Sequence, residues 1–209
     1  MKYLLSIIAV FFLITSCKKE KITSNPKNLA LKLEAIAKED QKFRKHRGEI
    51  KEKHGMNSPQ MIELNKNQSK VDSANLKTVI EIIKELGTYP GKSHVGIKAS
   101  KSAFFVLQHA PIEIRKNYLN MILDAAASNE LSKMNAAMFH DKCLMDQGKP
   151  QIYGTQIKYE TVTNNAGATY DTSYVWAIQD TVNIDQMRRD NGLNPLENYL
   201  SGYGKSRWK

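Results

Sequence analysis

The spacing of apolar residues changes once along this 209-residue chain, and that change limits the folds available to it. From residue 28 to residue 147 the apolar residues recur every three or four positions, the period of an amphipathic helix. Between residues 151 and 178, two segments alternate apolar and polar residues, as strands do. The pattern predicts an α+β fold: a mostly α-helical bundle with a late β-hairpin and short C-terminal helices.

Capping residues, glycines and a proline set the expected element boundaries. Asp72 or Ser73 caps one helix, and Gly87 ends it. Pro111 separates two further helices, and Ser132 caps the next, whose inward-facing residues include Met134. Asn183 and Asn194 cap two short C-terminal helices. The predicted helices are 28–53, a weaker stretch at 59–66, 73–86, 97–109, 112–127, 132–147, 183–192 and 194–202, and the predicted strands are 151–162 and 172–178.

The first predicted strand carries an unusual set of polar residues. Gln151, Tyr153 and Thr155 would share one face of it, because side chains alternate along a strand. Gly154 indicates a bulge or a close approach of another backbone. Three hydrogen-bonding side chains in a row are uncommon in a core, so this face is a candidate binding surface.

The first seventeen residues resemble the signal peptide and lipobox of bacterial lipoproteins. Lys2 precedes the apolar run Tyr3–Ile14, which is shorter than the roughly twenty residues that span a bilayer. The run ends in Ile14-Thr15-Ser16-Cys17, and in such proteins the cysteine is lipidated and becomes the first residue. The expected organisation is a signal peptide at 1–16, lipidated Cys17 with a tether to residue 27, and a single globular α-rich domain at 28–209.

The position of the positive charge argues against a nucleic-acid partner. The formal net charge is +10, and residues 18–53 have twelve basic and six acidic residues, whereas 54–209 have eighteen and fifteen. The excess therefore lies next to the predicted anchor, where it suits a helix near anionic lipid headgroups. We expect an exported protein anchored by lipid to the bacterial cell envelope, facing the periplasm or exposed at the surface, with no nucleic-acid partner.

The cysteine content bears on how the domain is stabilised. Apart from Cys17 the chain has only Cys143, so a lipidated Cys17 leaves no pair for an internal disulfide. The helical pattern around Cys143 predicts a small buried hydrophobe. The domain must then depend on its apolar core, for which 41% hydrophobic residues are sufficient.

Three charged residues, Asp40, Arg47 and Asp141, occupy positions where the helical pattern requires an apolar side chain. Burying an unpaired charge costs several kcal/mol, so each of them needs a partner. One interpretation is an internal ion-pair network, for which Asp40 and Arg44 are spaced one helical turn apart. The other is a polar pocket between helices.

His109 is the strongest single candidate for acid–base chemistry. It follows the apolar segment 103–107 at the end of a predicted helix, where the helix dipole favours a protonated ring. Gln108 beside it could orient a ligand. The alternative for His109 is a capping or hydrogen-bonded histidine without a functional role.

No metal site is predicted, and no motif identifies a cofactor. His140-Asp141, with His109 earlier in the chain, resembles the layout of the HD phosphohydrolases. However, the helical pattern points Asp141 inward, and a hairpin follows where that family continues as helix. No other cluster has metal-ligand spacing, and the phosphate-loop and nucleophile-elbow motifs are absent.

Three motifs, in this order, resemble an uncharacterised bacterial domain family over about residues 30–200. They are Asp40-Gln41-x-x-Arg44, Gln108-His109-Ala110 and Gln151-x-Tyr153-Gly154-Thr155-Gln156. The resemblance implies positions and not a reaction. Together with the pattern, it makes these the candidate pocket or catalytic residues: Asp40, Gln41, Arg44, Asp72, Gln108, His109, Asp141, Gln151, Tyr153, Thr155, Gln156 and Arg188.

Three functions remain open at this point. The first is a lipid-anchored envelope protein that binds a ligand or partner in a polar pocket. The second is a hydrolase or transferase in which His109 works with Asp141 or Asp40, and Arg44 or Arg188 holds an anion. This hypothesis requires that His109 and both carboxylates meet in a concave site. The third is a structural envelope lipoprotein.

Overall fold

The computed structural model describes residues 25–202 and 207–208. The predicted signal peptide at 1–16, Cys17 and the tether as far as residue 24 lie outside the described residues. Within the described ranges, no helix has the length and apolar composition needed to cross a membrane.

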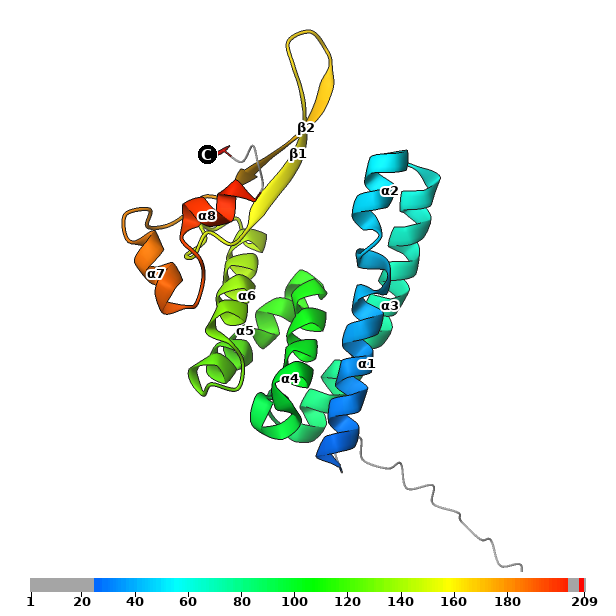
Figure 1. Ribbon diagram of the computed structural model, residues 1–209, viewed down its shortest axis with the longest axis vertical. Helices are drawn as coiled ribbons and strands as arrows, with labels where there is room; N and C mark the ends of the chain where they lie inside the picture. Colours follow the sequence, from blue (N-terminus) through cyan, green and yellow to red (C-terminus); the bar gives the residue numbers. More distant parts are fainter. Residues whose placement is uncertain (1–24, 203–206, 209) are drawn as a thin grey trace, which may run out of the picture.

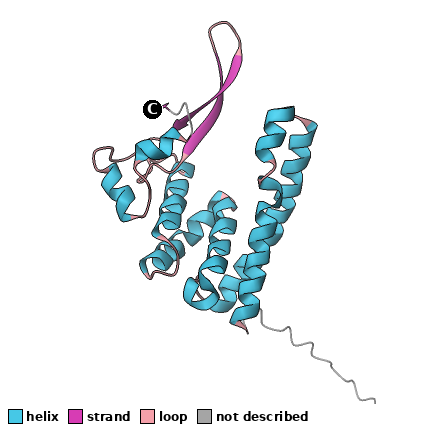
Figure 2. Cartoon of the chain, in the orientation of Figure 1, coloured by secondary structure: helices cyan, strands magenta, loops and turns pink. Residues whose placement is uncertain are grey.

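The described chain is mostly helical, with a small sheet late in the sequence (Figures 1 and 2). Strands β1 and β2 pair antiparallel, and the two-residue β3 pairs parallel to β2. This architecture confirms the predicted α+β fold. The elements are α1 (Pro26–Arg44), α2 (Arg47–His54), α3 (Pro59–Leu86), α4 (Lys92–His109), α5 (Ile112–Ala127), α6 (Lys133–Asp146), β1 (Ile157–Thr163), β2 (Thr169–Val175), α7 (Ile184–Asp190), α8 (Leu196–Ser201) and β3 (Arg207–Trp208).

The core lies between α1, α3, α4, α5 and α6, and its packing places the end of α4 beside α1. Helix α1 buries Leu29, Leu33 and Ile36 and packs against α4 and α3 (Figure 1). The apolar segment 103–107 of α4 is buried apart from the partly exposed Phe105, and α5 packs against α6. As a result His109, the last residue of α4, lies against the C-terminal part of α1, beside Asp40.

The predicted helix 28–53 is two helices in the structure. The chain turns at Lys45 and His46, between α1 and α2. Arg47 is exposed and not buried as the helical pattern predicted, and its Nη1 donates to Asn65 Oδ1 at 2.5 Å. Between Phe43 and Ile50 the chain has no apolar residue to bury, so no side chain there holds a continuation of α1 against the core.

The predicted helices 59–66 and 73–86 are one continuous helix, α3. Ser58 caps it by accepting a hydrogen bond from Met61 N at 3.2 Å, and Gly87 ends it with a φ of 71°. Asp72 and Ser73 therefore cap nothing. Ser73 Oγ donates to Ser69 O one turn earlier, and the Asp72 carboxylate binds side chains of the site described below.

Residues 151–156 form a loop and not the start of a strand. Only Gln151 forms a bridge there, to Ile178, and β1 begins at Ile157. Gln151, Tyr153 and Thr155 therefore do not share a strand face as predicted. The hairpin itself forms, and it projects from the helical body (Figure 1).

Two smaller expectations are also wrong. Met134 was expected on the inner face of α6, but it is exposed. Neither Asn183 nor Asn194 caps a C-terminal helix with its side chain. At α8 the carboxylate of Asp185 accepts the hydrogen bond from Leu196 N instead, at 2.8 Å.

Candidate functional site

Asp40 is a buried carboxylate at the centre of a polar cluster. Its side chain is 1% exposed, although it lies on a helix whose other buried residues are apolar. His109 Nδ1 lies 3.3 Å from Asp40 Oδ1, across the contact between α1 and α4. Arg44, one turn later on α1, reaches both carboxylate oxygens at 3.4 Å, and Gln41 Nε2 donates to Oδ2 at 2.7 Å.

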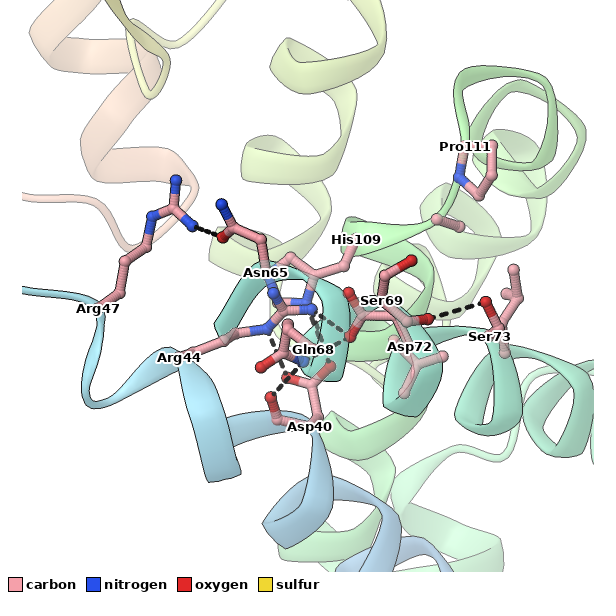
Figure 3. Close-up of a pocket in the computed structure, with 13 residues that line it drawn as sticks. Asp40, Arg44, Arg47, Asn65, Gln68, Ser69, Asp72, Ser73, His109 and Pro111 are labelled. Atoms are coloured by element: carbon pink, nitrogen blue, oxygen red, sulfur yellow. Dashed lines mark hydrogen bonds and ion pairs between the residues drawn. The ribbon is translucent and has the colours of Figure 1, made fainter. Parts of the chain in front are cut away.

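Helix α3 adds two residues to this cluster (Figure 3). Arg44 Nη2 donates to Asp72 Oδ1 at 2.5 Å, so one guanidinium joins two carboxylates. Gln68 Nε2 donates to the same Asp72 oxygen at 2.7 Å and to the backbone oxygen of Asp40 at 3.1 Å. Gln68 therefore connects α3 to α1 beside the ion pairs.

Five of these side chains, all but that of Gln41, line a cleft of about 430 Å³ between α1, α3 and the end of α4. His109 is 31% exposed, so its ring contacts both the buried carboxylate and the cleft. Several lining residues were not among the candidate pocket residues, although Arg47 had been noted for its place in the helical pattern; polar residues on α3 look like an ordinary solvent face. The additional lining residues are Arg47, Asn65, Gln68, Ser69, Ser73, Leu76, Val106, Ala110 and Pro111.

The electrostatics of the cluster favour an ionised Asp40. Burial raises the pKa of the Asp40 carboxyl, but the hydrogen bond and charge of His109, together with Arg44, outweigh it and hold that pKa below its usual value. An ionised carboxylate only accepts hydrogen bonds, so His109 Nδ1 must carry the proton between them. Nε2 is then the ring nitrogen left for a ligand.

Asp141 is the second buried carboxylate, and it binds backbone. It accepts hydrogen bonds from the amides of Ile152 at 2.7 Å, Tyr153 at 3.1 Å and Thr155 at 3.0 Å, and from Thr155 Oγ1 at 2.9 Å. Burial raises the pKa of Asp141, although these hydrogen bonds oppose the shift. Asp141 therefore attaches the 151–156 loop to α6.

The other polar side chains of this loop also bind backbone. Gln151 Nε2 donates to Trp176 O at 2.7 Å, and Gln151 Oε1 accepts from Gln156 N at 2.8 Å. Gln156 Nε2 donates to Met138 O on α6 at 3.2 Å. Arg188 of α7 is buried, and its Nη1 donates to Tyr153 O at 2.5 Å. These contacts hold the loop between α6, the hairpin and α7.

The structure therefore divides the predicted site residues into two groups. The cleft group is Asp40, Arg44, Asp72 and His109, which line the cleft, with Gln41, which binds Asp40 but does not line it. The loop group is Asp141, Gln151, Tyr153, Thr155, Gln156 and Arg188.

Gln108 has no hydrogen bond to either group, and its buried Oε1 has no partner among the described residues. The three-way arrangement of His109 with both carboxylates is not formed, since the hydrogen bonds of Asp141 go to the loop. The Asp40–His109 pair is formed. In the part of the chain that the structure describes, no group of three or more His, Cys, Asp and Glu residues is arranged to hold a metal ion.

Comparison with known proteins gives one informative result. No curated protein matches the chain, and no solved structure matches it. A family described as a family of unknown function (DUF6624) matches residues 27–205, a range that includes both the cleft and the 151–156 loop. The chain belongs to this family, DUF6624, whose function is unknown.

Proposed function

We propose that this protein is a lipid-anchored component of the bacterial cell envelope whose helical domain binds a small polar ligand in the cleft. The carrying observation is the buried Asp40, held 3.3 Å from a partly exposed His109 at the cleft wall. Burying a carboxylate with two charged partners costs more desolvation free energy than burying an apolar residue of similar volume. Its presence is explained if the cluster orients His109 towards a ligand.

The cleft favours a ligand with a hydrogen-bonding group and an acidic group. His109 Nε2 accepts from a hydroxyl or amine of the ligand when the ring is neutral. Arg47 lines the cleft and is exposed, so its guanidinium is available to a carboxylate or phosphate. The volume of about 430 Å³ falls in the range of pockets that bind small molecules.

Thermal unfolding tests this binding directly. A panel of small hydroxy acids, amino acids, acetate and inorganic phosphate is added to the wild-type chain and to two variants. We expect one or more probes to raise the Tm of the wild type and of His54→Ala, in which an exposed histidine outside the cleft is removed. His109→Ala should fold and lose that increase. If no probe raises the Tm of the wild type, the proposal is wrong.

The lipobox at residues 14–17 supports the anchor. Acyl chains on Cys17 would give stable attachment, because each buried methylene contributes about 0.8 kcal/mol. Mass spectrometry of the N-terminal peptide should find an acylated Cys17 as the first residue. An unmodified N-terminus, or the same membrane attachment in Cys17→Ser, would contradict the anchor.

A second candidate function is acid–base catalysis by a hydrolase or transferase, and the Asp40–His109 pair favours it. A carboxylate that holds Nδ1–H orients the ring and stabilises its protonated form during proton transfer. Asp40, and not Asp141, contacts His109 in this way.

A screen of chromogenic phosphate, ester and glycoside substrates tests the candidate. We expect turnover that falls by a factor of about 10² or more in His109→Ala and stays unchanged in His54→Ala. Turnover that survives in His109→Ala would exclude this role.

A further inference from the structure

We infer that the exposed lysine face of α1 binds the anionic phospholipids of the membrane surface and holds the domain against the bilayer. The lysine face consists of Lys27, Lys38, Lys42 and Lys45, with Leu31 between them. The inference rests on the proposed anchor at Cys17, since the anchor brings α1 to a membrane.

The lysine face lies along one side of α1 and its C-terminal cap. The five positions advance in steps that return to the same side of a helix, because α-helices have 3.6 residues per turn. All four lysines are exposed, and Leu31 is 59% exposed. The opposite side of α1 carries the buried Leu29, Leu33, Ile36 and Asp40.

The acidic residues near this face do not cancel its charge. Glu34 pairs with Lys98 of α4, which adds its own positive charge to the same surface. Glu39 pairs with Lys42 at 3.3 Å, and both side chains are about half exposed, so a charged surface can compete for Lys42. Lys38, Lys42, Lys45 and Lys98 line one groove of about 590 Å³, with Glu34 as its only acidic lining residue among those that the structure describes.

The length of the tether makes simultaneous contact possible. Lys27 lies ten residue-to-residue steps after Cys17, so the distance between them is at most about 35 Å. From Lys27 to Lys45 the helix extends for about 27 Å. A helix that lies parallel to the membrane therefore places all four lysines at the headgroups, with Leu31 facing the acyl boundary.

This orientation leaves the candidate site accessible. Asp40 and Arg44 leave α1 on the side away from the lysine face, towards α3 and α4. Binding of the lysine face to lipid would therefore not cover the cleft.

Chemical coupling to vesicles tests the inference without relying on natural lipidation. The mature chain is attached through Cys17 to a maleimide lipid, because the other thiol, Cys143, is buried and unreactive. The vesicles contain phosphatidylcholine, with or without phosphatidylglycerol. A water-soluble acetylating reagent then labels exposed lysines, and peptide mass spectrometry measures the labelling rate at each one.

We expect Lys27, Lys38, Lys42 and Lys45 to be acetylated at least about fivefold more slowly on vesicles with phosphatidylglycerol, at low salt. Lys66, Lys70 and Lys77, which are exposed on α3, should be labelled equally on both vesicles. Equal labelling of the lysine face on the two vesicles would overturn the inference. Equal protection of the α3 lysines would overturn it too, since any exposed lysine would then behave alike.

Two charge-reversal variants complete the experiment. K38E/K42E/K45E should abolish the protection of the remaining Lys27, whereas the matched control K66E/K70E/K77E should preserve it. Protection of Lys27 in both variants would overturn the inference. The anchor is tested separately by the mass of the natural N-terminus, so an unmodified Cys17 in cells and an unprotected lysine face are distinguishable failures.

Discussion

Asp40 and Asp141 are both buried carboxylates, but their partners differ in kind. Asp40 is bound by charged or chargeable side chains, Arg44 and His109, and these hold its pKa below the usual value against the effect of burial. Asp141 is bound by backbone amides and one hydroxyl, and burial dominates, so its pKa is raised. The first arrangement presents side chains to a cleft, and the second holds a loop in place.

The stability contribution of Asp40 should disappear in acid. Because its folded pKa is lowered, this contribution is complete above the unfolded pKa of about 4 and is lost as the pH falls through the folded pKa. Asp40→Asn should therefore lower the free energy of unfolding by about 3 kcal/mol at pH 5.5, where Arg44 and His109 lose their buried counter-charge. Urea unfolding from pH 5.5 to 2.5 should show the difference from wild type shrinking below about pH 4.

The exposed neighbour Glu39 provides the control. Glu39→Gln removes a surface pair with Lys42, so its effect should stay within about 1 kcal/mol at all these pH values. If the difference in free energy of unfolding between Asp40→Asn and wild type grew towards acid pH, Asp40 would not be an ionised carboxylate that stabilises the fold.

At the scale of elements, the 151–156 loop joins α6, the hairpin and α7. Asp141 binds its amides, and Arg188 binds the carbonyls of Tyr153 and Gly154 at 2.5 and 3.2 Å. Tyr199 of α8 also donates to Thr155 O at 2.8 Å. Gly154 has a φ of 66°, and its lack of a Cβ leaves room for the side chains of Ile178 and Leu196 beside the loop.

Gly154→Ala should therefore destabilise the fold more than the same change at Gly167. Both glycines have positive φ, so alanine is strained at either position by about 1 kcal/mol or more. A Cβ at Gly154 would also lie 2.9 Å from Ile178 Cδ1 and 3.1 Å from Leu196 Cδ1, whereas nothing lies within 4 Å at Gly167. In urea unfolding, Gly154→Ala should lower the free energy of unfolding by about 1–3 kcal/mol more than Gly167→Ala does. Equal losses would mean that the surrounding side chains move aside freely.

At the scale of the whole molecule, stability depends on one core without a disulfide in the described chain. Cys143 is a free thiol, 1% exposed, inside the same apolar cluster as the buried residues of α1, α3, α4 and α5. This confirms the predicted small buried hydrophobe. Burial raises the pKa of Cys143 to about 11, so the native thiol is both inaccessible and protonated at neutral pH.

Thiol labelling of Cys143 should report unfolding. In a chain that begins at residue 17 and carries Cys17→Ser, an aromatic disulfide reagent at neutral pH should react with Cys143 only in molecules that have opened. The labelling rate should then rise with urea in proportion to the unfolded population. Rapid labelling in the absence of urea would show that α6 separates from the core locally.

Local signals accounted for much of the secondary structure. Ser132 accepts from Asn135 N and begins α6, and Gly87 ends α3 in the left-handed conformation, as their sequence contexts predicted. The apolar segment 103–107 also predicted a buried stretch of α4. An apolar segment can be buried against any apolar partner, so this prediction does not depend on which partner it meets. Such features can be predicted without knowing which distant residues they contact.

Two of the errors occurred where a distant part of the chain binds a side chain whose role was assigned locally. Asp72 has the chemistry of a helix cap, but Arg44 from another helix takes its carboxylate, and α3 continues through it. The alternation at 151–156 predicted a strand, but Asp141 captures the amides that a strand partner would have used. A polar side chain can satisfy either a local or a remote donor, and the sequence does not show which one is near.

By itself, the sequence determined the fold class, the buried Cys143 and the charged positions that interrupt the apolar pattern, because periodicity and capping act over a few residues. Only the tertiary structure decided that Asp40 meets His109, 69 residues away, while Asp141 is committed to the loop. The physical reason is that helix packing sets the distances between remote side chains. The packing of α1 against α4 places Asp40 at a cleft. The chain folds back after α6, and Asp141 therefore binds the 151–156 loop.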